Sequence, residues 1–151
     1  MKRLGILIAA AVLTLASQTA HAENLMWGPQ AGFSISPDQI VFGFHAITPV
    51  GDRFDLVPSA DIGLGDSFFT VSLNGDLRMN LAPESALKPY VGGGVALFYA
   101  DPDEGDSHSE FGGNLLGGIW LNKGGQTAYY IEGKVGLGDV PDFKAMLGIN
   151  F

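Results

Sequence analysis

The segment FFTVSLNGDLRMNL, residues 68–81, alternates between two kinds of side chain. Every second residue from Phe69 to Leu81 is apolar or glycine, whereas the residues between them, from Thr70 to Asn80, are polar or charged. A period of two residues is the pattern of a β-strand whose two faces lie in different environments. The segment has 14 residues, and a tilted strand needs only about 9–11 to cross a bilayer. It therefore predicts a strand long enough to span a membrane.

The same alternation recurs on both sides of this segment, and the chain beyond residue 22 shows no helical period. Residues typical of turns separate the alternating runs. The predicted strands are residues 30–36, 40–48, 53–64, 68–81, 89–100, 110–122, 127–137 and 143–151. We predict an all-β fold, an eight-stranded antiparallel up-and-down transmembrane β-barrel whose even strand number brings both chain ends to one side. Because Pro58 cannot donate a backbone N–H, we expect a bulge or an end of pairing there.

The two faces of these strands differ in volume as well as in polarity. The apolar face carries Phe33, Phe42, Phe44, Phe54, Phe69, Phe111, Phe143 and Phe151. The other face is rich in small residues and includes Gly32, Gly43, Gly63, Gly112 and Gly118. The interior of an eight-stranded barrel is only just wide enough to be filled by side chains, so the small residues suit the lumen. The apolar face carries no charge, and we therefore predict that it points outward to lipid.

The first 22 residues have the features of a secretory signal peptide. Lys2 and Arg3 are followed by an almost wholly apolar run from Leu4 to Leu15, and Ala20-His21-Ala22 fits the small-residue cleavage site. The apolar run is shorter than the ~20 residues that a membrane-spanning helix needs. The sequence therefore divides into residues 1–22, a signal peptide, and residues 23–151, an outer-membrane β-barrel domain.

The composition excludes several classes of function. The chain has 151 residues, 22 of them glycine, and no cysteine, which rules out disulfide scaffolds and thiol catalysis. The formal net charge is −8, which argues against a nucleic-acid partner, because binding its phosphates requires Lys and Arg.

The small-residue face also carries charged residues of both signs. They are Asp61, Asp76, Arg78, Glu132, Lys134 and Lys144. An isolated ion in a narrow lumen is costly, so three acids and three bases are expected to form an internal salt-bridge network. Proton relay or ion conduction is the alternative role for such a network.

Aromatic residues fall into two bands near the ends of the predicted strands. Trp27, Tyr90, Trp120, Tyr129 and Tyr130 lie toward one rim, and Phe69, Phe98, Tyr99, Phe111 and Phe143 lie toward the other. Two such bands are typical of the interfacial girdles of membrane barrels.

Few other residues suggest chemistry. An acidic external loop carries Asp101, Asp103, Glu104, Asp106 and Glu110, whose oxygens suit Ca²⁺ or Mg²⁺, although their spacing is not that of an EF-hand. Ser107-His108-Ser109 beside Asp106 has the residue types of a catalytic triad, but neighbours in one loop rarely hold that geometry. His45 falls on the inward face and is expected to be a buried lumen residue. We therefore predict no catalytic residue, no metal site and no cofactor.

Two segments resemble small outer-membrane β-barrel proteins. Residues 143–151, FKAMLGINF, are similar to the closing strand of that class, and residues 88–96, KPYVGGGVA, are similar to a glycine-rich strand of the opacity/porin-like outer-membrane β-barrel domain family. The resemblance implies insertion by the barrel-assembly machinery, which reads Phe151 as an assembly signal, and both termini in the periplasm. It does not imply one activity, and the short external turns, apart from residues 101–109, depart from the adhesive members.

Three functions fit these observations. The leading hypothesis is a non-enzymatic, monomeric outer-membrane barrel that contributes to envelope structure or surface interaction, with outer-membrane lipid and lipopolysaccharide as its surroundings and no wide pore. The first alternative is a lipid-modifying enzyme on the same scaffold, which would need a lipid-facing His, Ser and acid. The second is a soluble periplasmic barrel that binds a small apolar ligand, which would need the apolar face to point inward.

Overall fold

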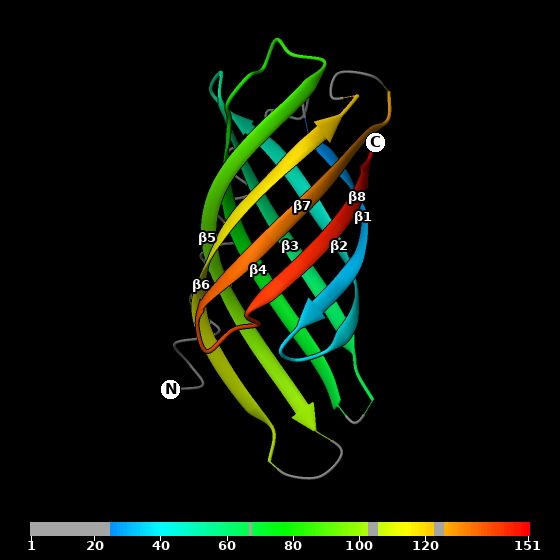
Figure 1. The fold of residues 1–151 in the computed structure, drawn as a ribbon, viewed down its shortest axis with the longest axis vertical. Helices are drawn as coiled ribbons and strands as arrows, with labels where there is room; N and C mark the ends of the chain where they lie inside the picture. The colour runs from blue at the N-terminus through cyan, green and yellow to red at the C-terminus, as the bar shows by residue number, and fades with distance from the viewer. Residues whose placement is uncertain (1–24, 67, 103–105, 123–125) are drawn as a thin grey trace.

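The protein is a single closed antiparallel β-barrel of eight strands (Figure 1). The structure is a computed structural model that describes residues 25–66, 68–102, 106–122 and 126–151. The strands are β1 (Met26–Ile35), β2 (Gln39–Val50), β3 (Phe54–Leu64), β4 (Phe68–Asn80), β5 (Leu87–Pro102), β6 (His108–Leu121), β7 (Ala128–Gly138) and β8 (Phe143–Asn150). No helix in the described part of the chain is long and apolar enough to cross a membrane.

Each strand pairs with the next one along the chain, and β8 pairs with β1 to close the barrel. The predicted fold class is confirmed, and each predicted run forms a strand. The largest difference lies in β1, which begins at Met26 rather than at residue 30. The cause is Pro29, which reads as a strand breaker in the sequence but pairs with Phe44 of β2 in the structure.

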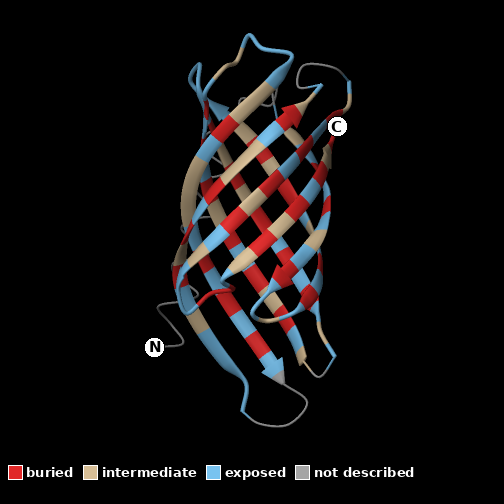
Figure 2. Ribbon diagram, viewed as in Figure 1, coloured by how far each residue is buried: buried red, intermediate tan, exposed pale blue. Residues whose placement is uncertain are grey.

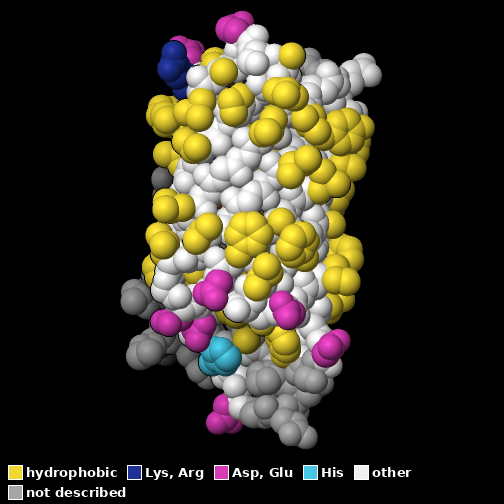
Figure 3. Space-filling view, viewed as in Figure 1, with side chains coloured by type: hydrophobic (Ala, Val, Ile, Leu, Met, Phe, Trp, Pro, Cys, Tyr) yellow, Lys and Arg dark blue, Asp and Glu magenta, His cyan; other side chains and the backbone are white. Residues whose placement is uncertain are grey.

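The wall of the barrel is apolar outside and polar inside. Buried and exposed residues alternate along every strand (Figure 2), as the two-residue period requires. Large hydrophobic side chains cover the outside (Figure 3), and Phe111, for example, is 62% exposed. The inward positions hold the buried polar and charged residues. This polarity is the reverse of a soluble barrel and is the one that the sequence predicts.

The two ends of the barrel differ. The start of β1 and the end of β8 lie at one end, here called the terminal end, at the top of Figure 1. The other end, here called the loop end, carries the connections β1–β2, β3–β4, β5–β6 and β7–β8. The described acids at the loop end are Asp38, Asp66, Asp101, Asp106, Glu110, Asp139 and Asp142. Of the described residues, no exposed Lys or Arg lies at that end, so the loop end is strongly acidic.

Pro58 interrupts pairing on one side only. It pairs with Gly75 of β4, but the ladder between β2 and β3 skips from His45↔Ser59 to Thr48↔Leu56. The register is the same on both sides of this gap, so no residue is inserted. Pairing with β2 is interrupted at Pro58 and then resumes, so the strand pairing does not end there and the alternative of a bulge is also wrong.

Candidate functional site

The barrel lumen brings together all six charged residues that the sequence assigns to it. Asp61, Asp76, Arg78, Glu132, Lys134 and Lys144 are all buried, with Asp76 and Arg78 exposing 0% and 1% of their surface. They come from β3, β4, β7 and β8, because the inward positions of these strands alternate with lipid-facing ones. The lumen is the only part of the described chain where buried charges of both signs meet.

Four of the charged side chains form one continuous chain of ion pairs. Arg78 Nη2 lies 2.7 Å from Glu132 Oε2, and Lys134 Nζ lies 3.6 Å from Glu132 Oε1. Lys134 also donates to Asp76 Oδ2. Because each ion has a partner of opposite charge, their burial does not leave a bare charge in a low-dielectric interior.

Asp61 and Lys144 form a second group toward the loop end. Their closest charged atoms, Lys144 Nζ and Asp61 Oδ2, are 3.6 Å apart, and Lys144 also donates to Ser72 Oγ at 3.1 Å. Asp61 Oδ2 accepts from Asn74 Nδ2 at 3.0 Å, and Gln30 donates to Asp61 Oδ1. Neutral donors therefore supply most of the hydrogen bonds to this carboxylate.

The lumen holds a fourth acid that the expected network of three acids and three bases leaves out. Asp55 is 2% exposed, and its Oδ2 accepts a hydrogen bond from Asn80 Nδ2 at 2.9 Å. The expected balance of charges is therefore wrong, because four carboxyl groups face three cations inside the described barrel. The alternation of β3 places Asp55 on the same face as Asp61, and this pattern in the sequence already indicates that Asp55 points into the lumen.

Aromatic rings surround the Arg78 guanidinium. Its Cζ atom lies 4.6 Å from the ring centroid of Tyr130, 4.9 Å from that of Tyr90 and 5.8 Å from that of Trp120. Arg78 Nε and Nη1 have no hydrogen-bond partner among the described residues. The cation–π contacts with the three rings are the attractive interactions of this part of the guanidinium. The hydroxyl of Tyr90 donates to Glu132 Oε2 at 2.9 Å, which ties the rings to the ion pair.

These rings correct the predicted aromatic bands. Tyr90, Trp120 and Tyr130 are fully buried in the lumen, and Phe98 of the other band is 5% exposed. Trp27 and Tyr129 do face outward, as do Phe69, Tyr99 and Phe111. Closeness to a strand end predicts which rim a residue lies near. Whether it points into the lumen or outward depends on its odd or even place along the strand, because successive side chains point to opposite faces.

Two apolar clusters lie inside the described lumen. The larger one, called here the terminal plug, contains Ile47, Val57, Tyr90, Leu116, Trp120, Ala128 and Tyr130. The smaller one contains Ala96, Phe98, Ala100 and Val140, the last from the β7–β8 turn. Apolar side chains thus occupy parts of the lumen on both sides of the ion pairs.

His45 is a buried residue of the lumen and is 3% exposed. Its Nε2 bonds to Asn150, its Nδ1 lies 3.4 Å from the Tyr130 hydroxyl, and the two rings meet edge to face at 5.2 Å. His45 therefore connects β2 with β7 and β8.

The acidic external loop is only partly described. Asp103 and Glu104 lie outside the described residues, whereas Asp101 and Asp106 are exposed and Glu110 is partly exposed. His108 Nε2 lies 3.5 Å from Glu110 Oε1, and the flanking Ser107 and Ser109 are exposed. No group of three or more potential metal ligands occurs in the described parts of the chain.

Phe151 lies on the outer wall at the terminal end and is 58% exposed. Its N–H and C=O form hydrogen bonds with Trp27, at 3.0 and 3.3 Å. The rings of these residues meet at 6.3 Å, and Trp27 also stacks on Phe44 at 5.9 Å. Three aromatic rings therefore bridge β8, β1 and β2 where the barrel closes.

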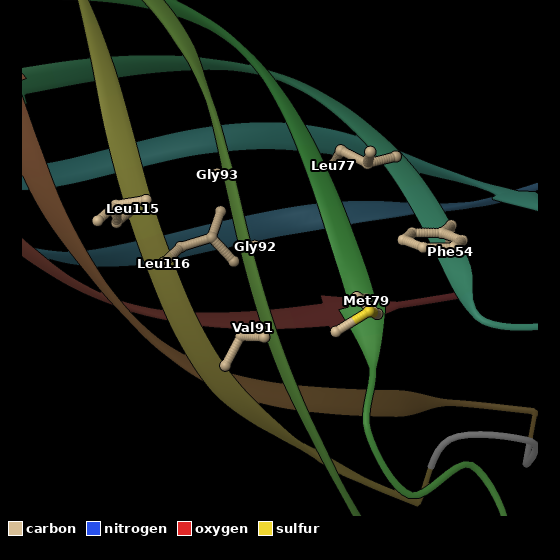
Figure 4. A pocket seen from close by; sticks show the side chains of 8 residues that line it. All are labelled: Phe54, Leu77, Met79, Val91, Gly92, Gly93, Leu115 and Leu116. Atoms are coloured by element: carbon tan, nitrogen blue, oxygen red, sulfur yellow. The ribbon is translucent and has the colours of Figure 1, made fainter.

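A groove of about 540 Å³ lies in the outer wall (Figure 4). Its lining residues come from four consecutive strands. Phe54, Leu77, Met79, Val91, Gly93 and Leu115 face outward, whereas Gly92 and Leu116 hold inward positions. Local sequence does not reveal this groove, because the groove depends on which side chains lie next to one another across strands.

Solved structures show what this architecture resembles. No family model and no curated protein sequence matches the chain. The N-terminal β-barrel domain of Pseudomonas aeruginosa OprF matches with a TM-score of 0.72 and 15% identity, covering 84% of this chain and 95% of that one. Neisserial surface protein A matches with a TM-score of 0.64 and 13% identity, over 83% and 94% of the two chains.

A third match is the Yersinia pestis outer membrane protein Ail, with a TM-score of 0.53 and 12% identity, over 85% of this chain and 99% of that one. Identities this low carry the fold and not a shared activity. The outward apolar wall agrees with the match to an outer membrane protein. The protein therefore has the fold of the small eight-stranded outer-membrane β-barrels.

Proposed function

We propose that the protein is a non-enzymatic, monomeric outer-membrane barrel that contributes to envelope structure or surface interaction. The observation that carries this proposal is the polarity of the wall, with large apolar side chains outside and paired charges inside. A bilayer satisfies such an outer wall, whereas water would face an apolar surface far larger than the patches of ordinary soluble proteins. Residues 1–22 direct the chain out of the cytoplasm and are removed.

The lumen is proposed to be closed to solutes rather than to form a wide pore. The terminal plug and the ion pairs contribute large buried side chains from every side of the barrel. Eight strands enclose a space that side chains can fill, and this supports the same conclusion. The charge network then serves to hold the strands in one arrangement.

The orientation and partners follow from the same proposal. The terminal end faces the periplasm, and the acidic loop end faces the cell surface and its lipopolysaccharide. The barrel-assembly machinery acts on the chain during insertion, with Phe151 as its signal. Trp27 lies beside Phe151 at the terminal end, where rings favour a membrane–water interface, and it also stacks on Phe44.

Both alternative functions are less well supported. A lipid-modifying enzyme would need a His, a Ser and an acid on the lipid-facing wall, but His45 lies in the lumen and His108 lies beside Glu110 at the loop end. A soluble barrel for an apolar ligand would need its large apolar residues inside, whereas most of them point outward.

Membrane fractionation combined with gel mobility tests the proposal. The full chain should sediment with outer membranes and should migrate differently in unheated and heated samples, because a folded barrel resists detergent. A soluble periplasmic product without a mobility shift would contradict it. Ion conductance of the purified protein in planar bilayers tests the closed lumen separately, and large steady conductance would contradict that part alone.

A further inference from the structure

The groove in the outer wall arises from one missing side chain between two large ones. Gly93 of β5 pairs with Leu77 of β4 on one side and with Leu115 of β6 on the other. All three positions face outward, and the two leucines are 46% and 57% exposed. A glycine between two exposed leucines leaves a notch with a large side chain on either side, unlike the outward glycines Gly117 and Gly133, which pair with each other.

Neighbouring side chains extend this notch into a groove (Figure 4). Met79 pairs with Val91 beside it, and Phe54 at the start of β3 pairs with Met79 from the other side. The groove is an open hollow of about 540 Å³. A hydrocarbon chain can therefore lie with one side against its lining and its other side toward neighbouring lipid.

The lining decides the chemistry of the occupant. No charged side chain is among the lining residues, so nothing in the groove can bind a headgroup or an ion. The groove opens on the wall that faces hydrocarbon in the proposed function. A twofold interface centred on the groove would place one hollow against the other and leave a void, which disfavours a second copy seated there.

The position along the strands decides the leaflet. Met79 is the residue before the end of β4, and Phe54 is the first residue of β3, so the groove lies in the terminal half of the barrel. In the proposed orientation this half spans the periplasmic leaflet, which consists of phospholipid.

We infer that the groove between Leu77, Gly93 and Leu115 holds one acyl chain of a phospholipid from the periplasmic leaflet. This inference rests on the proposed membrane function. A bound chain fills the notch and supplies the apolar contacts that Gly93 does not make, at a place where mobile lipid would otherwise have to bend around the leucines.

Two matched pairs of variants test this inference. Val91→Phe and Leu77→Phe fill the groove. Val95→Phe and Leu73→Phe introduce the same ring on the same two strands and the same face, at positions that do not line it. Val95 and Leu73 are 48% and 45% exposed, close to the 42% and 46% of Val91 and Leu77.

The four variants and the wild type are folded into vesicles of phosphatidylethanolamine and phosphatidylglycerol, extracted into mild detergent, and analysed by native mass spectrometry. The wild type and the two controls should retain one bound phospholipid. The two groove-filling variants should retain it at least about fivefold less often, since a chain displaced by a ring loses its contacts.

Each other outcome overturns the inference. Equal retention in all five proteins would mean that the groove holds no lipid. A dimer that the groove-filling variants abolish would make a second copy the occupant, and retention of added lipid A in place of phospholipid would make the leaflet wrong. If a groove-filling variant does not fold, a phospholipid with a photoactivatable acyl chain maps contacts on the wild type, and labelling spread evenly around the barrel would contradict the inference. Failure of the wild type to enter vesicles would instead contradict the proposed function.

Discussion

Gly148 of β8 lies directly against the ring of Tyr130, so closely that a Cβ atom at position 148 would overlap the ring carbons. The two residues belong to the neighbouring strands β8 and β7, and Tyr130 pairs with Gly148 in the ladder. The same relationship recurs between Gly118 and Tyr90, where a Cβ atom would meet the phenol group. Tyr90 and Tyr130 fit into this narrow lumen because one cross-strand neighbour of each ring has no side chain.

Gly148→Ala should therefore destabilise the barrel. The Tyr130 ring cannot move aside freely, because Trp120, His45 and Arg78 all contact it. We expect a loss of about 1–3 kcal/mol in the free energy of unfolding, the usual cost of overfilling an interior. Urea unfolding in bilayers measures it. The matched control is Gly133→Ala, whose new methyl group would face outward at an ordinary 3.6 Å from the Phe143 ring, and an equal loss in both variants would contradict the argument.

Arg78→Met should remove more stability than any exposed substitution. It leaves Glu132 without its 2.7 Å partner in a lumen that already has one acid in excess of its cations. We expect a loss of about 3–5 kcal/mol, as for other buried ion pairs that lose one member. Arg53→Met at the exposed β2–β3 turn is the control. A loss below about 0.5 kcal/mol for Arg78→Met, within the range of surface changes, would mean that the ion pair contributes little.

Deletion of Phe151 should impair assembly in cells far more than refolding in detergent. The deletion removes both the proposed assembly signal and the aromatic contact with Trp27. Trp27→Ala removes this contact, together with the stack on Phe44, but leaves Phe151 in place, so it separates the proposed signal from the packing. Heat-dependent gel mobility of cell membranes and of refolded protein gives the folded fraction in each setting. Normal assembly of the deletion variant in cells would mean that Phe151 is not the signal.

A protease site placed in the acidic external loop should be cut on intact cells. The loop joins β5 to β6 at the loop end, which faces the cell surface in the proposed orientation. The same site placed between residues 82 and 87, in the β4–β5 connection at the terminal end, should be protected. Immunoblots of treated cells distinguish the two cases, and cleavage only at residues 82–87 would invert the orientation.

The positions of the strands follow from local sequence. Alternation between Phe69 and Leu81 determines both the strand and its outward face, since each neighbouring residue must point to the opposite side. The same alternation predicts the inward charges, because the residues on the small-residue face of each strand can be identified from that strand's sequence alone. Asp55 shows the same pattern but lies at the second position of β3, where a strand end and a turn look alike.

The contents of the lumen depend on contacts across strands, which local sequence does not reveal. Tyr90 and Tyr130 lie inside because Gly118 and Gly148, many residues away along the chain, leave room for them. Arg78 forms an ion pair with Glu132 and contacts three aromatic rings. From the sequence alone, Asp61, Asp76 and Glu132 are equally good candidates for its partner. The Leu77–Gly93–Leu115 notch is hidden for the same reason, since its three residues belong to three strands.

The division between a wall that needs only apolar residues and a lumen built from matched pairs has an evolutionary consequence. Outward positions can exchange Leu, Ile, Val and Phe freely, because hydrocarbon is an equally good solvent for each. An inward glycine and the ring that lies on it, such as Gly148 and Tyr130, must instead be replaced together. Descendants of such a barrel lose sequence similarity quickly along half of every strand while the backbone stays the same. Kinship in this architecture is therefore better traced through covarying lumen pairs than through overall identity.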